Sequence, residues 1–273
     1  MGNRLRPVQE IPASLCREIR GILFDIDDTF TFLGKIPPGA FSSLWDAKSA
    51  GLILAPITGR PAGWADHMAR MWPVDGIIGE NGAFYFCSDR KGKHLKQHFF
   101  VEDASERARN QERLREIFVE VKKAFPTARL AVDQPYRVCD LAVDFCEDVR
   151  PPLTIEDARR IQEIFERGGA RAKISSIHVN AWFGDYDKLT MCKRYFRQEY
   201  AIDLEAEKDR FLFCGDSPND SPMFAFFPFS VGVAGVRLFQ EAGLMDHMPS
   251  YIAEQDGGLG FEETVKSVLE GRS

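Results

Sequence analysis

The sequence predicts an α/β protein with a Rossmann-like, doubly wound parallel-sheet core and an inserted α+β cap domain. Strand and helix patterns alternate in the first third of the chain and again after about residue 185, which is typical of a parallel sheet covered by helices. Between these parts the helices are few and the strands follow one another like hairpins. We therefore expect the core over residues 1–83 and 185–273 and the cap over residues 84–184.

The elements of the core follow from apolar runs and helical spacing. Before the insertion we expect a strand at 21–24, a helix at 39–50, a strand at 52–57, a helix at 61–71 and a strand at 76–78. After it we expect a helix at 188–199, a strand at 211–214, a helix at 222–226, strands at 230–233 and 250–253, and a helix at 261–269.

The cap has a different pattern, with one long charged helix and several short strands. The expected elements are strands at 84–87 and 98–101, a helix at 105–125, strands at 129–132 and 141–145, a helix at 155–167 and a strand at 173–183.

Composition excludes several classes of protein. The 273 residues carry a net charge of −6, without the basic excess expected of a nucleic-acid-binding protein. No apolar stretch approaches the roughly 20 residues that span a membrane, and the N-terminus has no signal-peptide pattern. The six cysteines form no CxxC pair and several lie in apolar runs, so we expect buried free thiols and a cytoplasmic protein. The oligomeric state is left open.

Three carboxylates stand directly after the first core strand. Asp25, Asp27 and Asp28 follow the apolar run Gly21-Ile-Leu-Phe24. Two unit charges about 4 Å apart repel by roughly 4 kcal/mol at an effective dielectric constant near 20. A proton, solvent or a bound cation has to relieve such repulsion.

Two other core strands end in polar residues in the same way. Residues 52–57 run into Thr58-Gly59-Arg60, and residues 211–214 run into the segment Gly215-Asp-Ser-Pro-Asn-Asp220. Ligands of an open parallel sheet bind beyond the carboxyl ends of its strands, so we expect these three segments to converge.

The converging residue types suit phosphoryl transfer. Asp25, Asp27 and Asp216 supply the hard oxygen ligands that Mg²⁺ prefers, and Thr58 and Ser217 supply hydroxyl donors. Lys188 opens the helix after the insertion and offers a positive charge. A cation would also reconcile an acidic site with a phosphorylated ligand.

These segments resemble the four motifs of the haloacid-dehalogenase-like (HAD) hydrolases, in the family's order. The motifs are Asp25-Ile-Asp27-Asp28-Thr29, Thr58-Gly59-Arg60, Lys188 and the segment from Gly215 to Asp220. The long insertion resembles the large α+β cap of the subgroup that holds Cof-type, sucrose-phosphate, trehalose-phosphate and mannosylglycerate-phosphate phosphatases. Just before it, Glu80-Asn81-Gly82-Ala83 matches a segment that is common at the start of that cap.

The resemblance implies a role for each matching residue. Asp25 would be the nucleophile and Asp27 the acid and base, while Thr58 and Lys188 would hold the phosphoryl oxygens. Mg²⁺ would be held by Asp25, Asp27 (through its backbone carbonyl), Asp216 and Asp220. Substrate contacts would come from Thr58, Gly59, Arg60, Asn81 and Asn219.

Two positions depart from the pattern of this subgroup. Asp28 stands where most relatives have glycine, and we expect its side chain to point outward. Lys188 is followed by Leu189-Thr190 without the usual glycine, which leaves Lys193 as a competing candidate.

Residues 175–183 alternate in polarity. Ser176, His178, Asn180 and Trp182 share one face of the expected strand. This face is either solvated or a substrate-contacting surface on which His178 and Asn180 bind a sugar's hydroxyl groups. Arg137 is a further candidate contact.

The sequence thus predicts a Mg²⁺-dependent phosphatase, a phosphoric monoester hydrolase that forms an aspartyl-phosphate. Its partner would be a small phosphorylated substrate, with a sugar phosphate as the class implied by the resemblance. A phosphohexomutase on the same core remains an alternative, although the cap strands hold only Arg129, Arg137 and Arg171 to grip a bisphosphate. A non-catalytic phospholigand-binding protein is the other alternative, and intact Asp25 and Asp27 argue against it.

Overall fold

The computed structural model describes residues 5–88, 94–175 and 177–273. The chain divides into two compact units, each of which is described by itself. Unit 1 takes the described parts of Met1–Thr58, Met71–Ile77 and Cys192–Ser273, and unit 2 those of Gly59–Arg70 and Ile78–Met191. The expected cap, residues 84–184, lies within unit 2. Its boundaries at 84 and 184 stay predictions, because unit 2 also takes in residues 59–70, 78–83 and 185–191.

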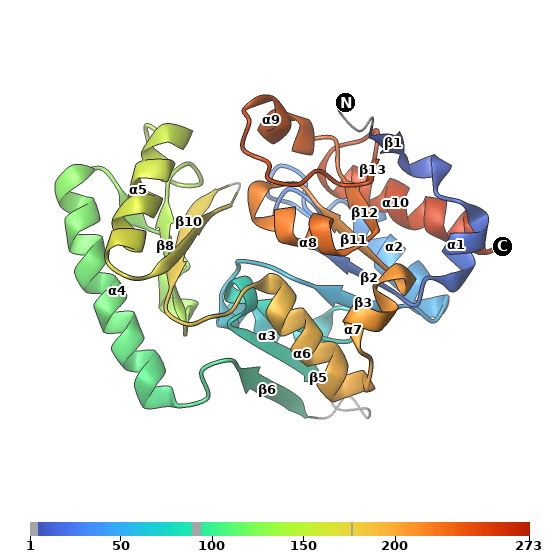
Figure 1. The fold of residues 1–273 in the computed structure, drawn as a ribbon, viewed down its shortest axis with the longest axis horizontal. Coiled ribbons are helices and arrows are strands. Elements are labelled where there is room, and N and C mark those ends of the chain that lie inside the picture. The colour runs from blue at the N-terminus through green and yellow to red at the C-terminus, as the bar shows by residue number, and fades with distance from the viewer. Residues whose placement is uncertain (1–4, 89–93, 176) are drawn as a thin grey trace. The chain divides into compact units, whose positions relative to one another are not determined.

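Unit 1 contains the predicted parallel sheet. Its six strands lie in the order β1-β13-β12-β11-β2-β3, and all five pairings between neighbours are parallel (Figure 1). The strands are β1 (Arg6–Pro7), β2 (Gly21–Phe24), β3 (Ile53–Pro56), β11 (Phe211–Gly215), β12 (Phe229–Gly232) and β13 (Tyr251–Ile252).

Helices cover both faces of this sheet, which confirms the doubly wound prediction. On one face, residues of α1, α2 and α10 share a buried cluster with Ile22 and Phe24 of β2. On the other, Phe211 and Phe213 of β11 contact the rings of Phe196 in α6 and Phe224 in α8. The helices are α1 (Ala13–Glu18), α2 (Pro38–Ser49), α6 (Lys188–Tyr200), α7 (Leu204–Glu207), α8 (Ser221–Phe226), α9 (Val236–Glu241) and α10 (Gly257–Arg272).

Unit 2 has the α+β character that the sequence predicts. The sheet β7-β8-β10-β9 is antiparallel throughout, and α4 and α5 share one buried apolar cluster with it (Figure 1). These elements are α4 (Ala104–Ala124), β7 (Arg129–Leu130), β8 (Asp140–Asp144), α5 (Ile155–Arg167), β9 (Arg171–Ile174) and β10 (His178–Trp182). Helix α3 (Ala62–Met71) also belongs largely to this unit.

Two strand predictions are wrong in detail. Residues 76–78 were expected in the core sheet, but β4 (Ile77–Gly79) joins a separate sheet with β5 (Phe84–Ser88) and β6 (Leu95–Phe99). Residues 173–183 were expected to be one strand, but they form the hairpin of β9 and β10. The hydroxyl of Ser175 accepts hydrogen bonds from the backbone N–H groups of Ile177 and His178 and so stabilises the turn. Ser176 lies outside the described residues.

The N-terminal elements β1 and α1 were not predicted, because the first residues are polar and interrupted by proline. Arg6 and Pro7 nevertheless pair with Tyr251 and Ile252, and Cys16 of α1 is fully buried in the core. All six cysteines are free thiols, of which only Cys146 is not classed as buried. None of the helices within the described ranges is both long and apolar enough to cross a membrane.

Phe261 of α10 joins the helical layer to the strand that precedes Asp25. Its ring centroid lies 4.7 Å from that of Phe24 and 5.2 Å from that of Phe30, and the side chain is fully buried. We expect Phe261→Ala to lower the free energy of unfolding of unit 1 by about 3–5 kcal/mol, measured by urea denaturation. Leu238→Ala, at a position that is 70% exposed, is the control and should change it by less than about 0.5 kcal/mol. Equal effects of the two substitutions would contradict this packing.

Candidate active site

The three predicted strand ends meet at one edge of the core sheet. Strand β2 lies between β11 and β3, and Phe24 is in register with Cys214 on one side and Pro56 on the other. The N–H of Asp25 donates to the carbonyl oxygen of Cys214 at 2.9 Å. Asp25, Thr58 and Asp216 therefore leave adjacent parallel strands in the same direction, which confirms the predicted convergence.

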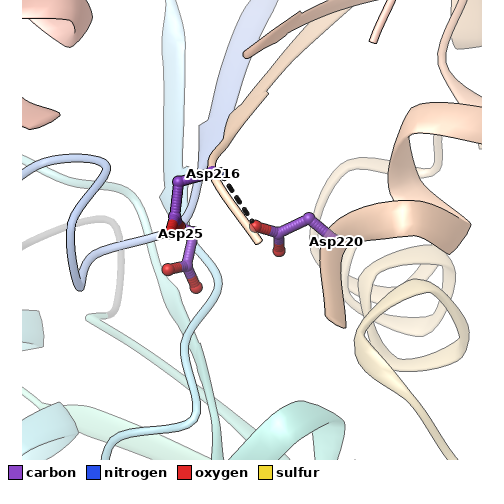
Figure 2. A group of neighbouring side chains, drawn as sticks. All are labelled: Asp25, Asp216 and Asp220. Atoms are coloured by element: carbon purple, nitrogen blue, oxygen red, sulfur yellow. Dashed lines mark hydrogen bonds between the residues drawn. The ribbon is translucent and has the colours of Figure 1, made fainter. Parts of the chain in front are cut away.

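Three buried carboxylates gather at this edge. One oxygen from each of Asp25, Asp216 and Asp220 lies within 4.8 Å of the other two. Figure 2 shows Asp25 and Asp216 next to each other, with Asp220 reaching toward them from the start of α8. The three residues are 5%, 2% and 0% exposed, respectively. The group is therefore shielded from the water that would otherwise solvate its charge.

Local hydrogen bonds fix two of these carboxylates. Oδ2 of Asp220 accepts from the backbone N–H groups of Asp216 at 3.1 Å and Ser217 at 3.4 Å. The hydroxyl of Thr29 donates to Oδ1 of Asp216 at 2.9 Å. A Cβ atom at Gly215 would lie 2.6 Å from Oδ2 of Asp220, so the close approach requires glycine. The role of Thr29 was not predicted, although it belongs to the first motif.

The electrostatics of the cluster favour a cation. Burial raises the pKa of Asp216 well above its usual range, and the charges of Asp25, Asp220 and Asp28 raise it further, against the hydrogen bond from Thr29. Oxygen-only ligands of this charge suit Mg²⁺. The residues present therefore fit the predicted metal, with Asp25, Asp216 and Asp220 as the side chains that would hold it.

Asp27 and Asp28, the other two carboxylates of the first motif, lie at half-buried positions. Asp27 is half-buried, and its predicted acid–base and metal-binding roles stay predictions. Asp28 is half-buried as well, and its charge acts on Asp216; the outward direction of its side chain stays a prediction. Its φ of 55° lies in the left-handed region, which explains why glycine suits this position.

Two further predicted residues lie in unit 1. Thr58 is fully buried where the chain leaves β3. Asn219 accepts a hydrogen bond at Oδ1 from the hydroxyl of Ser217 at 2.8 Å. Their contacts with a substrate stay predictions.

Lys193, the alternative to Lys188, is engaged elsewhere. Its ammonium group pairs with Glu205 at 2.5 Å and lies 4.5 Å from the ring centroid of Phe226. Lys188 is buried at the first position of α6, in unit 2. Lys188 as the phosphate-binding lysine stays a prediction.

Arg60 is held by acidic residues of unit 2. Its guanidinium pairs with Glu147 at 2.8 Å and with Asp133 at 3.4 Å, and lies 4.5 Å from the ring centroid of Trp64. These contacts give Arg60 a structural role within unit 2. Its predicted substrate contact is not tested by them.

His178 and Asn180 are not on a solvated face. Every residue of β10 is buried, which excludes the solvated alternative. Nε2 of His178 lies 2.9 Å from Oε2 of Glu147, and Nδ2 of Asn180 donates to Asp140 at 3.0 Å. Burial would raise the pKa of Glu147, but the neighbouring His178 and Arg60 outweigh it and lower the pKa to about 2. Both side chains thus belong to a buried polar network, and their contact with a substrate stays a prediction.

The centre of that network was not predicted. Arg137 is buried and pairs with Asp133 at 2.9 Å and Asp140 at 3.0 Å, so it is not poised outward for a ligand. Burial and the charge of Asp140 raise the pKa of Glu80 to about 7, against the opposing charge of Arg137. One signal in the sequence could have pointed to Glu80, namely the resemblance of Glu80-Asn81-Gly82-Ala83 to the start of the cap, but only Asn81 of this segment was predicted as a site residue. Asn81 is itself buried, beside Gly59.

The six-stranded parallel sheet with helices on both faces, its acidic edge and the separate α+β unit define a doubly wound α/β protein with an additional domain. Solved structures of the HAD superfamily share this fold over nearly their whole length, so the chain has the HAD fold with a large α+β cap.

Three of these structures illustrate the similarity. A HAD/Cof-like hydrolase of Plasmodium vivax is 17% identical, with a TM-score of 0.67 over 96% of this chain and 99% of its own. A Thermoplasma acidophilum protein is 19% identical, with a TM-score of 0.66 over 92% and 98%. The sucrose-phosphatase of Synechocystis, solved with sucrose and phosphate, is 17% identical, with a TM-score of 0.60 over 92% and 98%. No protein-family model and no curated protein sequence matches the chain.

The raised pKa of Asp216 makes a prediction about stability. A carboxyl whose pKa is raised by folding stabilises the protein below its ordinary pKa, and this stability is lost as the pH rises through the raised value. In EDTA, the free energy of unfolding of the wild type relative to Asp216→Asn should therefore be lower at pH 8 than at pH 5. Added Mg²⁺ should raise the free energy of unfolding of the wild type at pH 8 but not that of the variant.

Chemical denaturation at the two pH values measures this difference. Asp246→Asn, at an exposed carboxylate, is the matched control and should show neither effect. A difference between the wild type and Asp216→Asn that is independent of both pH and Mg²⁺ would contradict the electrostatic account.

Proposed function

We propose that the protein is a Mg²⁺-dependent phosphatase that hydrolyses a small phosphorylated metabolite. The single observation that carries the proposal is the buried cluster of Asp25, Asp216 and Asp220 at the carboxyl edge of the parallel sheet. Such a cluster is costly unless it holds a cation, and an oxygen-bound divalent cation is what a phosphoryl group needs nearby. Proteins with this fold include a sucrose-phosphatase and a subclass IIB sugar phosphatase, which supports a sugar phosphate as the substrate class.

In the proposed reaction, a carboxylate oxygen of Asp25 attacks phosphorus while the bond from phosphorus to the ester oxygen breaks. Asp27 donates a proton to the departing alkoxide. Asp27 then takes a proton from water as the water oxygen bonds to phosphorus, and the bond from phosphorus to Asp25 breaks. Inorganic phosphate and the alcohol are the products.

The remaining residues bind and orient the phosphoryl group. Thr58 and Lys188 donate to its oxygens and balance its charge, with Gly59 and Asn219 beside them. Bound Mg²⁺, held by Asp25, Asp216, Asp220 and the carbonyl of Asp27, supplies positive charge next to these oxygens. Arg60, Asn81, His178 and Asn180 are the proposed substrate-contacting residues of unit 2.

The alternative of a phosphohexomutase is less well supported. A mutase has to bind the second phosphate of a bisphosphate intermediate, for which arginines are the usual ligands. Arg137 is buried between Asp133 and Asp140, and Arg171 pairs with Asp185. Of Arg129, Arg137 and Arg171, only Arg129 is both exposed and without an ion pair among the described residues, so one arginine at most is left for a second phosphate. Hydrolysis asks for no such second site.

The test is phosphate release from a series of sugar phosphates, with Mg²⁺ or with EDTA. We expect metal-dependent release that Asp25→Asn lowers by at least about 10³-fold, because the nucleophile is lost. Release without metal, or by Asp25→Asn at the wild-type rate, would refute the mechanism. An isomeric sugar phosphate without free phosphate would identify a mutase, and binding without turnover a non-catalytic protein.

The two lysine candidates give a further prediction. Lys188→Ala should lower kcat/KM by about 10²-fold or more, because a charge next to the transferred phosphoryl group is removed. Lys193→Ala removes only its contacts with Glu205 and Phe226 and should leave kcat/KM within about threefold. Steady-state kinetics on the best substrate measure both. The reverse order of effects would reassign the motif to Lys193.

A further inference from the structure

Three consecutive residues of unit 2 adopt left-handed backbone conformations. Glu80, Asn81 and Gly82 have φ values of 43°, 55° and 104°. Asparagine tolerates this region, but left-handed backbone at a glutamate such as Glu80 is strained. Strain of this kind persists only where surrounding contacts enforce it, so the contacts of this left-handed turn, Glu80–Gly82, indicate what the strain achieves.

Glu80 holds the chain that continues from Thr58. Its N–H donates to the carbonyl oxygen of Arg60 at 3.1 Å, and its Oε1 accepts from the N–H of Ala62 at 3.0 Å. The same carboxylate accepts from the N–H groups of Val138, Cys139 and Asp140 at 2.9, 2.6 and 3.0 Å. The backbone and the buried side chain of Glu80 thus connect residues 60–62 to residues 138–140.

Arg137 binds Gly59 itself, and the side chain of Asn81 lies beside it. The guanidinium of Arg137 donates to the carbonyl oxygen of Gly59 at 2.8 Å. A Cβ atom at Gly59 would lie 3.3 Å from both terminal atoms of the Asn81 side chain. The backbone of residues 59–62 is therefore fixed at three points by the left-handed turn and its buried arginine.

Gly82 connects the same turn to the start of α6. A Cβ atom at Gly82 would lie 2.1 Å from the carbonyl oxygen of Asp187 and 2.9 Å from the nitrogen of Lys188. The turn therefore lies against the backbone that carries Lys188, at a distance that only glycine permits.

We propose that the left-handed turn Glu80–Gly82 is a positioning element that fixes the spacing between residues 59–62 and residues 187–188. Thr58 is covalently joined to the first of these segments and Lys188 belongs to the second. The turn would thereby present both phosphate-binding side chains to one phosphoryl group. This inference rests on the proposed function and adds Glu80, Gly82 and Arg137 to it as positioning residues that do not touch the substrate.

Kinetics of Glu80→Gln and Gly82→Ala test the proposal. The glutamine amide replaces one acceptor oxygen by donors that face backbone N–H groups, and the alanine Cβ has to displace residues 187 and 188. Each variant should lower kcat by about 10- to 100-fold with little change in KM, because misplaced groups are felt most in the transition state. An unchanged kcat in both folded variants would overturn the proposal.

Double-mutant cycles distinguish positioning from a loss of stability. Glu80→Gln should lower kcat by less than about threefold in a Thr58→Ala background, and Gly82→Ala should lower kcat by less than about threefold in a Lys188→Ala background. Full additivity in both cycles would overturn the proposal. If Glu80→Gln does not fold, Arg137→Lys replaces it, because lysine cannot donate to Gly59, Asp133 and Asp140 together.

Two matched controls lie in unit 2. Gly169 has a φ of 81° but no atom within 4 Å of an added Cβ, so Gly169→Ala imposes backbone strain without the contact of Gly82→Ala. Glu163→Gln removes a carboxylate from an exposed pair with Arg167. Both should stay within about twofold of the wild-type kcat. Losses equal to those of the test variants would overturn the proposal.

Hydrogen exchange separates this proposal from the proposed function. Peptides covering residues 58–64 and 185–192 should exchange slowly in the wild type, the first faster in Glu80→Gln and the second faster in Gly82→Ala. Exchange unchanged in both variants would overturn the positioning role even if the enzyme is a phosphatase. If the wild type releases no phosphate, the proposed function fails, and exchange alone then decides whether the turn fixes the two segments.

Discussion

The burial of three carboxylates at one edge of the parallel sheet is the constraint on which the site depends. At an effective dielectric constant near 20, charges less than 5 Å apart repel by roughly 3–4 kcal/mol per pair. Asp25, Asp216 and Asp220 nevertheless lie within 4.8 Å of one another and are almost fully buried. The arrangement is enforced by the register of β2 with β11, by the missing side chain at Gly215 and by the backbone donors at Asp216 and Ser217. A bound divalent cation turns this repulsion into a favourable interaction.

Unit 2 buries carboxylates too, but it neutralises them with its own cations. Arg137 lies between Asp133 and Asp140, and Arg60 between Asp133 and Glu147. Removing one partner of such a buried pair leaves an uncompensated charge, which is strongly destabilising. The two units thus differ in how the charge of their buried carboxylates is balanced. In unit 2 the charge of the carboxylates is balanced by arginines of the protein itself, whereas in unit 1 the proposed metal ion would balance it.

The sequence predicted the part of the fold that depends on local patterns. The expected helix at 155–167 matches α5 in full, and the strand at 21–24 matches β2, because amphipathic spacing and a short apolar run are visible within one segment. The short strand at 76–78 was placed in the wrong sheet, because its pairing partner is chosen by tertiary contacts that no local pattern records. The turn within 173–183 was missed because Ser175 and Ser176 also fit the alternation of a strand.

In the candidate site, too, some residues could be predicted from sequence patterns and others depend on tertiary contacts. Asp25 and Asp216 could be brought together from the rule that parallel strands end at one edge, which needs no side-chain detail. Glu80 and Arg137 could not, because each acts on backbone groups far away in sequence: Glu80 on residues 138–140 and Arg137 on Gly59. Backbone donors and acceptors are the same at every residue, so the sequence carries no mark of which of them a buried charge will bind.

Asp28 combines a local backbone preference with an electrostatic effect on a residue far away in sequence. Its left-handed φ of 55° is a local property that glycine would satisfy at lower cost, and its N–H donates to the hydroxyl of Thr31 at 3.0 Å. An aspartate here places a further negative charge close enough to raise the pKa of Asp216. The strain and the added repulsion both disfavour aspartate in the metal-free protein. A cation at the cluster offsets the second cost directly, since a fourth carboxylate near a divalent ion adds attraction. In the proposed metal-bound site, Asp28 would therefore increase the dependence of the protein on its metal beyond that given by Asp25, Asp216 and Asp220 alone.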